Sequence, residues 1–209
     1  MCLPGRVRDE GDPANPYGSW RGSRVFIVAS GPSLTEEDAR TTEGKGRTIA
    51  VNTSVTIAPH ADMLYAGDAQ WWMHNEPLWQ TFRRIRVTSS KPAALKYDLT
   101  FVPRDGERGL SRYGVSTGGN SGHQAMCAAY LMGAAEIVLL GFDMMADGLK
   151  NHWHNDHVRS TNPTRSLYAR WRFNIENLAV SLSAKGVRVL NASRRTALSI
   201  ERISIEDLR

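Results

Sequence analysis

The stretch Val25-Phe-Ile-Val-Ala-Ser-Gly-Pro-Ser-Leu34 decides the fold of this chain. Its first half is an apolar, β-branched run, which predicts a buried strand. The run stops at Gly31-Pro32-Ser33, a turn that combines a bare backbone with a hydroxyl group. Such a turn either simply ends the strand, as Gly and Pro commonly do, or is a place where an anion approaches the backbone. The stretch alone leaves both interpretations open.

Strand and helix signals alternate along the rest of the chain. Runs rich in Val, Ile and Leu predict strands at 24–29, 47–52, 62–66, 84–88, 136–141 and 187–191. Capping residues and apolar side chains at helical spacing predict helices at 35–40, 69–82, 121–132 and 164–185. Because several strands are apolar on both faces, helices are expected on both sides of the sheet. We therefore predict an α/β fold with a single doubly wound, mostly parallel, Rossmann-like sheet.

The composition of the 209 residues fits one such domain, which we predict at 23–209. Residues 1–22, rich in Gly, Pro, Asp and Asn, are predicted to form a loosely ordered arm without the apolar core of a secretory signal. No apolar run reaches membrane-spanning length, so no membrane partner is expected. Cys2 and Cys127 lie far apart in sequence, which favours a reducing cytoplasm. The sequence does not decide whether the protein forms a homo-oligomer.

The net charge of +5 comes entirely from the end of the chain. Residues 151–209 hold 10 Lys and Arg against 5 Asp and Glu, whereas positive and negative residues balance in 1–150. A solvated basic face accounts for this excess, and so does contact with an anionic ligand such as a phosphate or a nucleic acid.

Polar or glycine-rich turns follow the predicted strands, at the edge where α/β proteins bind their ligands. These turns are Ser30–Ser33, Asn52–Ser54, Gly67–Asp68, Gly141–Asp143 and Ser116–Gly122, and the last one opens a predicted helix. Glycines let backbone N–H groups approach a phosphate, and a helix N-terminus adds partial positive charge. The glycine spacing matches neither a Walker loop nor the dinucleotide fingerprint. Five such turns on one edge predict a nucleotide-binding site of another kind.

Four segments follow one another in the order "ASGPSL", "AVNTS", "DMLYAGD" and "TGGNSGHQAMCAAYLMGAAEIVLLGFDM". In this order they resemble a Rossmann-like nucleotide-binding superfamily that includes the family-42 bacterial sialyltransferases and the archaeal-type 6-hydroxymethylpterin diphosphokinases. The resemblance covers roughly residues 24–200. The segments "HWHNDH", "NPTRSLYARW" and "GVRVLNAS" resemble the uncharacterised phage-encoded branch of this superfamily. This resemblance implies that the protein is located in the cytoplasm of a host cell.

The resemblance implies a role for each strand-end residue. Gly31, Pro32 and Ser33 would line the phosphate of a nucleotide-activated donor, and Asn52 would hold its ribose or phosphate. Asp68 would lie at the donor cleft. The remaining donor-binding residues would cradle the donor or border its base and sugar, and they are Thr117, Gly118, Asn120, Ser121, Gly141, Phe142 and Asp143.

The histidine-rich segment "HWHNDH" at 152–157 carries the predicted chemistry. In the sialyltransferases a histidine downstream of the G-x-D strand is the general base on the acceptor. We predict this role for His154 or His157, because an imidazole titrates near neutral pH, and Asp156 is placed to orient a neighbour. A metal cluster and a purely structural loop are the alternatives.

The chain departs from the sialyltransferases at the leaving group. Those enzymes place two tyrosines before the histidine to stabilise the departing phosphate, and 144–151 contains no tyrosine. Lys150, Trp153 and Arg159 are the candidates to replace them. This departure argues against sialyl transfer, whereas it does not weaken the prediction of nucleotide binding.

Aromatic residues give further expectations. Trp72, close to the end of the strand at 62–66, is a candidate to stack on a base or sugar. Trp79, Trp171 and Tyr65 are expected in the core.

Three functions follow from these observations. The favoured one is a metal-independent, glycosyltransferase-like enzyme without a tightly bound cofactor. It would use a CMP- or UDP-type donor and a hydroxyl acceptor, which is a small molecule, a glycan or a modified nucleic acid. The second is diphosphate transfer from ATP to a small hydroxymethyl compound, with Mg²⁺ held by carboxylates such as Asp68 and Asp143. The third is a nucleotide-binding module without catalysis.

Overall fold

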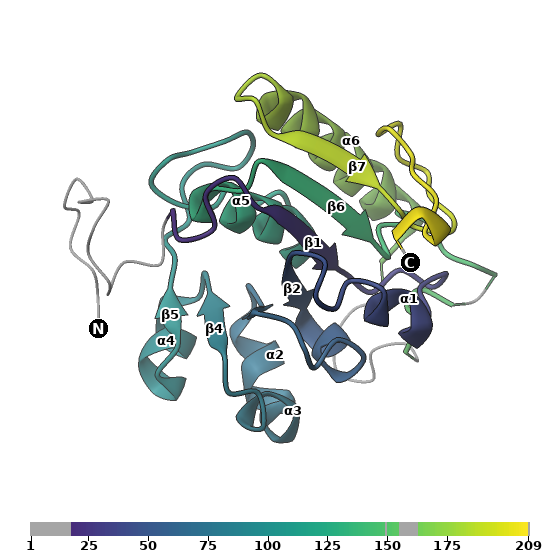
Figure 1. Cartoon of the computed structure of the whole chain (residues 1–209). Coiled ribbons are helices and arrows are strands. Elements are labelled where there is room, and N and C mark those ends of the chain that lie inside the picture. The colour runs from purple at the N-terminus through teal and green to yellow at the C-terminus, as the bar shows by residue number, and fades with distance from the viewer. Residues whose placement is uncertain (1–17, 149, 155–162, 209) are drawn as a thin grey trace.

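Within the described residues, seven strands form one sheet in the order β5-β4-β3-β2-β1-β6-β7 (Figure 1). The computed structural model describes residues 18–148, 150–154 and 163–208. The strands are β1 (Arg24–Val28), β2 (Arg47–Val51), β3 (Met63–Tyr65), β4 (Ile85–Thr88), β5 (Thr100–Phe101), β6 (Glu136–Leu140) and β7 (Arg188–Asn191). Every neighbouring pair runs parallel. The predicted parallel α/β sheet is therefore confirmed.

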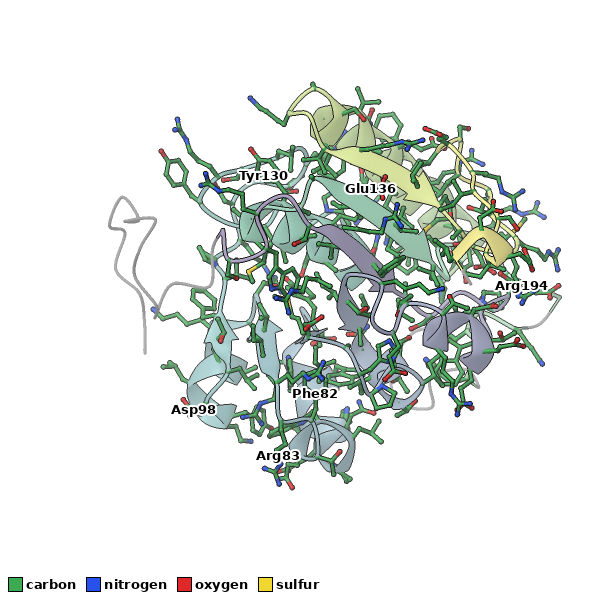
Figure 2. All side chains as sticks on the ribbon, viewed as in Figure 1. Phe82, Arg83, Asp98, Tyr130, Glu136 and Arg194 are labelled. Carbon is green, nitrogen blue, oxygen red and sulfur yellow. The ribbon has the colours of Figure 1, made fainter. Side chains whose placement is uncertain are left out.

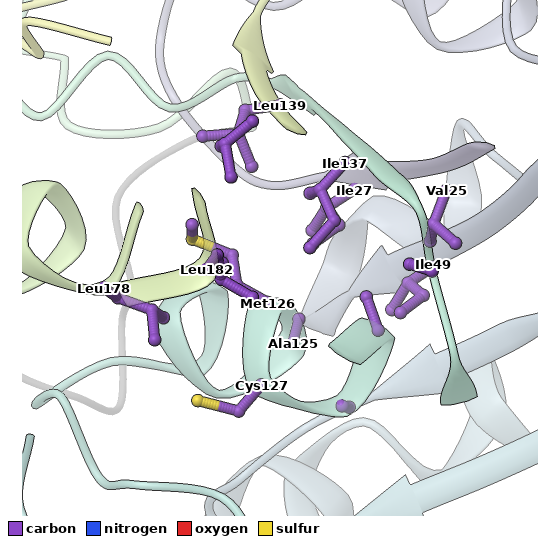
Figure 3. Close-up of a cluster of buried hydrophobic side chains, with 14 of the residues drawn as sticks. Val25, Ile27, Ile49, Ala125, Met126, Cys127, Ile137, Leu139, Leu178 and Leu182 are labelled. Atoms are coloured by element: carbon purple, nitrogen blue, oxygen red, sulfur yellow. The ribbon is translucent and has the colours of Figure 1, made fainter. Parts of the chain in front are cut away.

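Helices cover both faces of this sheet. They are α1 (Glu36–Arg40), α2 (Ala69–His74), α3 (Glu76–Gln80), α4 (Lys91–Tyr97), α5 (Ser121–Met132) and α6 (Arg165–Ser183), with the 3-10 turns η1 (Asn52–Thr56) and η2 (Glu206–Leu208). Val25 and Ile27 pack in the cluster of α5 and α6 (Figure 3), whereas Phe26 and Val28 pack in the cluster of α1 to α4. The sheet is thus doubly wound, as predicted. Among the described helices, none is both long and apolar enough to cross a membrane.

All six predicted strands are present, and the helix predicted at 121–132 is α5 with the same bounds. α1 begins at the predicted capping box: the Asp38 N–H donates to Thr35 Oγ1 (3.1 Å), and the Thr35 N–H donates to Asp38 Oδ2 (3.2 Å). α6 is followed by Gly186 with a left-handed φ of 80°. Glycine takes this conformation without the steric cost of a Cβ, and so it commonly ends helices.

The structure differs from the prediction between residues 69 and 101. The single helix predicted at 69–82 is two helices, because α2 ends at His74 and α3 has Pro77 in its first turn. A proline lacks the N–H of the helical ladder, and its ring clashes with the carbonyl four residues earlier. α4 and β5 were not predicted, since α4 buries only Ala93 and Ala94 and β5 is too short to show an alternating pattern.

The predicted N-terminal arm differs from the structure in its last five residues. Trp20 is buried in the core, with 4% of its surface exposed. The backbone N–H groups of Gly18, Trp20 and Gly22 donate to carbonyl groups of residues 131–133 at 2.8–3.0 Å. Residues 18–22 therefore belong to the domain, and residues 1–17 lie outside the described residues.

The basic C-terminal segment is tied to α1 by an ion pair, although the two are far apart in sequence (Figure 1; Arg194 is labelled in Figure 2). Arg194 Nε and Nη2 each lie 2.7 Å from one oxygen of the buried Asp38 carboxylate. Burial alone would raise the pKa of Asp38, but its hydrogen bonds, foremost those from Arg194, lower the pKa instead. Two further arginines of this segment pair with acidic residues: Arg188 with Glu201 and Arg195 with Asp147. Part of the basic excess is thus engaged within the protein.

The strand order changes direction between β1 and β6. The chain places β2 to β5 on one side of β1 and then returns to place β6 and β7 on the other side. At such a switch point the connections leave toward opposite faces, and a crevice opens beyond the carboxyl ends of the two strands. The turns Ser30–Ser33 and Gly141–Asp143 meet at this crevice.

Candidate functional site

A cavity of about 850 Å³ opens at the switch point. It lies beyond the carboxyl ends of β1, β2, β3 and β6 and extends to α5 and α6. Nine of the twelve residues predicted to bind the donor line it: Gly31, Pro32, Asn52, Asp68, Thr117, Asn120, Ser121, Gly141 and Phe142. Cavities of this size bind cofactors and drug-sized ligands. The structure thus brings the predicted turns together around one cavity, while Ser33, Gly118 and Asp143 are not among its lining residues.

The turn after β1 packs directly on the turn after β6. The Gly31 N–H donates to the Gly141 carbonyl at 2.7 Å. A Cβ on Gly31 would lie 2.2 Å from Asp143 Oδ1 and 2.5 Å from the Gly141 carbonyl oxygen. The Ser33 N–H donates to Asp143 Oδ2 at 2.8 Å, and Ser33 Oγ accepts from the Arg195 N–H at 3.2 Å. The close approach of the two turns is therefore itself a reason for a glycine at position 31.

Asp143 is the buried carboxyl group of the switch point, with 1% of its surface exposed. Its Oδ1 atom has no hydrogen-bond partner among the described residues. Burial raises the pKa of Asp143 to about 6, although the hydrogen bonds from Ser33 and the charge of Arg195 act in the opposite direction. The charge of this group therefore changes close to neutral pH.

Asp68 is the one carboxylate among the described residues that line the cavity. Asp68 lines it but serves as the N-cap of α2, where its Oδ1 atom accepts from the Gln70 N–H at 2.9 Å. Asp143 is close to Gly31 but does not line the cavity. Across the described ranges, no group of three His, Cys, Asp or Glu side chains is arranged to hold a metal ion. Of the two carboxylates named for the diphosphokinase alternative, only Asp68 lines the cavity, and both this alternative and metal independence stay predictions.

The N-terminus of the 12-residue helix α5 lies at the cavity. Asn120 caps it, since its Oδ1 atom accepts from the His123 N–H at 2.9 Å. The Asn120 Nδ2 atom is buried and has no partner within the described part of the chain. Gly118 precedes the helix with a φ of 53°, and a Cβ there would lie 2.0 Å from the His123 ring, so the turn requires glycine. A helix N-terminus with an unused amide donor favours an anionic ligand.

Asn52 follows β2 and lines the same cavity. Its φ of 54° is left-handed, which is uncommon for a residue with a Cβ and is tolerated best by asparagine and aspartate. Its Oδ1 atom is buried without a hydrogen-bond partner among the residues described. A strained backbone that presents an unused acceptor to a cavity supports a ligand-binding role.

Aromatic side chains line the cavity from two sides, and they are not the ones predicted. Trp72 is fully buried and its Nε1–H donates to the Ala66 carbonyl, so the expectation that it stacks on a ligand is wrong. Its neighbour Trp71 lines the cavity instead. Trp171 was expected in the core, but with Tyr168 of α6 it lines the opposite side, and the two rings meet edge to face. Trp79 and Tyr65 are buried as expected.

The histidine segment is anchored beside the turn after β1. The Trp153 N–H donates to the Ser30 carbonyl at 3.2 Å, and its Nε1–H donates to Ser54 Oγ at 3.2 Å. His152 lines the cavity and stacks on His154, with ring centroids 5.2 Å apart and planes at 5°. His154 is not among the lining residues. Of the other predicted catalytic residues, Asp156 and His157 lie outside the described residues.

Sequence reasoning passed over several cavity residues. His152 belonged to the segment that was singled out, but spacing could not show which histidine faces the cavity. Tyr168 lies after the segment in which a tyrosine was sought. Arg104 also lines the cavity, and it belongs to no motif that would have drawn attention to it.

No protein-family model, curated protein or solved structure matches this chain. An inference about function therefore rests on the fold and the cavity. The chain is a Rossmann-like α/β protein with a polar, aromatic-lined cavity at its switch point.

Proposed function

We propose that this protein is a nucleotide-dependent transferase of the Rossmann-like superfamily that its sequence resembles. The observation that carries the proposal is the N-terminus of α5, whose buried Asn120 Nδ2 donor has no partner among the described residues and lies at the switch-point cavity. An anion is the ligand that such a position stabilises. A nucleotide phosphate is the anion that α/β proteins most often bind at this place in the fold.

The donor binds with its phosphate at α5 and its base or sugar between the aromatic walls. Trp71 of α2 and Trp171 of α6 provide flat apolar faces on which a ring stacks. The Asn52 Oδ1 acceptor is free to receive a hydrogen bond from a ribose hydroxyl or a base amino group. Asn120 Nδ2 and Asn52 Oδ1, the two amide atoms in these contacts, have no partner among the described residues.

The chemistry is transfer of the activated group to a hydroxyl acceptor, with His152 as general base. The imidazole takes the proton of the acceptor hydroxyl, and the acceptor oxygen forms a bond to the donor carbon. The bond between that carbon and the nucleotide phosphate oxygen breaks, and its electron pair leaves with the nucleotide. We assign the base to His152 and not to His154 because His152 lines the cavity. His157 remains a competing assignment from the sequence.

A nucleotide screen tests this function. The folded protein is titrated calorimetrically with CMP, UDP and ATP, each with and without Mg²⁺, and the cognate sugar nucleotides are then assayed for release of the nucleotide. We expect binding of CMP or UDP without metal, followed by turnover. ATP binding that depends on Mg²⁺ would indicate the diphosphokinase, and binding of every donor without turnover would indicate a non-catalytic module. Absence of any nucleotide binding would contradict the proposal.

A further inference from the structure

Arg104 is the one Lys or Arg among the described residues that line the switch-point cavity. It follows β5, is exposed, and has no carboxylate within 4.0 Å among the described residues, unlike Arg24, Arg47 or Arg195. An arginine that faces a cavity without a carboxylate keeps its charge available for a ligand. Its side chain would be expected to move freely unless other contacts hold it.

The Arg104 guanidinium is held by two acceptors. Its Nε–H donates to Ser89 Oγ at 3.2 Å, and its Nη2 donates to the Gly67 carbonyl at 3.0 Å. Ser89 Oγ in turn lies 3.0 Å from Gln124 Oε1, which also accepts from the Tyr65 hydroxyl at 3.0 Å. Buried side chains of β3, of α5 and of the end of β4 therefore fix one edge of the guanidinium and leave its other donors for a ligand.

The backbone at Arg104 is fixed as well. Arg104 forms a parallel bridge with Val115, and the Val115 N–H donates to the Pro103 carbonyl at 2.9 Å. A Cβ on Gly114 would lie 2.2 Å from that carbonyl oxygen, so the two segments touch closely. Because backbone and side chain are both held before any ligand arrives, little conformational entropy is lost on binding.

The position of Arg104 separates it from the turn after β1. Its partner Gly67 follows β3, and β3 is the second strand away from β1 in the sheet. Neighbouring strands lie about 4.8 Å apart, which places Gly67 about 10 Å from the end of β1. The Gly67 N–H donates to Ser121 Oγ at 3.2 Å, and Ser121 is the first residue of α5. Arg104 therefore lies beside the N-terminus of α5 and meets a part of the ligand distant from the Gly31 turn.

We propose that Arg104 is a specificity-determining residue that binds an oxyanion, a carboxylate or a phosphate, on the part of the ligand next to the N-terminus of α5. The proposal rests on the proposed function in naming the class of donor: one that carries a second anionic group close to the phosphate at α5. The planar guanidinium binds two oxygens of such a group at once, which a lysine cannot do.

Two small anions test Arg104 independently of any nucleotide. Pyrophosphate and malonate are titrated at millimolar concentrations into the wild type, R104Q, R104K and R83Q, with tryptophan fluorescence as the readout because Trp71 and Trp171 line the cavity. Arg83, labelled in Figure 2, is exposed and does not line this cavity, so R83Q is the control for the change in net charge. Melting temperatures confirm that each variant is folded.

We expect one of the two anions to bind the wild type and R83Q equally and R104Q about 10- to 100-fold more weakly, the range of hydrogen bonds between charged groups. Pyrophosphate binding would identify a phosphate as the group that Arg104 binds, and malonate binding would identify a carboxylate. R104K should fall between the wild type and R104Q, and it carries the test if R104Q does not fold. If neither anion binds, or if R104Q and R104K bind like the wild type, the proposal is overturned.

CMP and UDP titrated into the same variants separate this proposal from the proposed function. Loss of anion binding in R104Q, together with no nucleotide binding to the wild type, would support the role of Arg104 and contradict the proposed function. Nucleotide binding to the wild type, together with unchanged anion binding in R104Q, would support the proposed function and contradict the role of Arg104.

Discussion

Ser33 and Asp143 lie on opposite sides of the switch point, and the Ser33 backbone N–H donates to Asp143 Oδ2 at 2.8 Å. This bond joins the turn after β1 to the turn after β6. It also brings a carboxyl group into a buried position that only its unionised form occupies without cost. The two turns that frame the cavity are therefore coupled to the protonation of one residue.

Asp143→Asn should remove a pH dependence from the stability of the fold. Burial raises the pKa of Asp143 from its usual 3.8 to about 6, so between these values the folded protein binds more protons than the unfolded chain. Its contribution to the free energy of unfolding is therefore full below about pH 4 and is lost as pH rises through about 6, in total on the order of 2–3 kcal/mol. Urea unfolding of both proteins from pH 4 to 8 measures the difference.

The free energies of unfolding of Asp143→Asn and the wild type must be compared, because the titration of His123 changes the stability with pH in the opposite direction. Burial lowers the pKa of His123 to about 4, so its contribution rises with pH through the same window. The wild-type profile alone therefore mixes opposing contributions, and His60, whose pKa is also lowered by burial, adds to that of His123. A difference between Asp143→Asn and the wild type that does not change with pH would show that Asp143 titrates normally.

Gly31→Ala should destabilise the fold by about 2 kcal/mol, the usual cost of an added group in a close-packed place. The added Cβ would meet Asp143 Oδ1 and the Gly141 carbonyl oxygen. Ser33→Ala is the control, because it keeps the backbone N–H that binds Asp143 and loses only the contacts of Oγ with Arg195 and Asp143. Unfolding in urea compares them. Equal stability of the two variants would mean that the turns are not packed as closely as described.

Asn52→Gly should separate backbone strain from ligand binding. Glycine adopts the left-handed φ of 54° without steric cost, so the free energy of unfolding should change by less than about 1 kcal/mol. Loss of the Oδ1 acceptor should weaken nucleotide binding about 2- to 10-fold, the range of a neutral hydrogen bond. Calorimetric titration measures the affinity. Unchanged affinity would remove Asn52 from the donor site.

His152→Ala should lower the rate of transfer about 10²- to 10⁴-fold while donor affinity stays nearly unchanged. The activity of the wild type should also fall in acid, because a protonated imidazole cannot accept the proton of the acceptor. His154→Ala is the comparison, and it should lose less, since His154 is not a cavity residue. Initial rates with the donor found in the screen decide between them. A large loss in His154→Ala with little loss in His152→Ala would favour the assignment made from sequence.

The sheet could be predicted because its strands are buried on both faces. Runs such as Val25–Val28 and Glu136–Leu140 are apolar at nearly every position, and the turns after them contain glycine, so both the strands and their ends are visible. β5 and α4 could not be predicted, because two strand residues and two buried alanines leave no periodic pattern. The break between α2 and α3 is indicated in the sequence by Pro77, because a proline disfavours the interior of one continuous helix.

The cavity could be predicted only in part. Strand ends meet at one edge of a parallel sheet, so residues such as Asn52 and Asn120 could be placed together from sequence. The rotation of a helix about its axis decides which neighbour faces the cavity, and this separates Trp71 from Trp72. Arg104 depends on contacts with Ser89 and Gly67 that no local pattern encodes.

Asn120→Asp tests the central claim, that an anionic nucleotide binds at the N-terminus of α5. Aspartate caps a helix as well as asparagine does, and its charge is favourable there, so the melting temperature should be unchanged or higher. The same charge would repel a bound phosphate. Calorimetric titration with the nucleotide identified in the screen should therefore give affinity at least about tenfold weaker than that of the wild type, a change that corresponds to about 1.4 kcal/mol. Equal affinity in a fully folded Asn120→Asp protein would contradict the account.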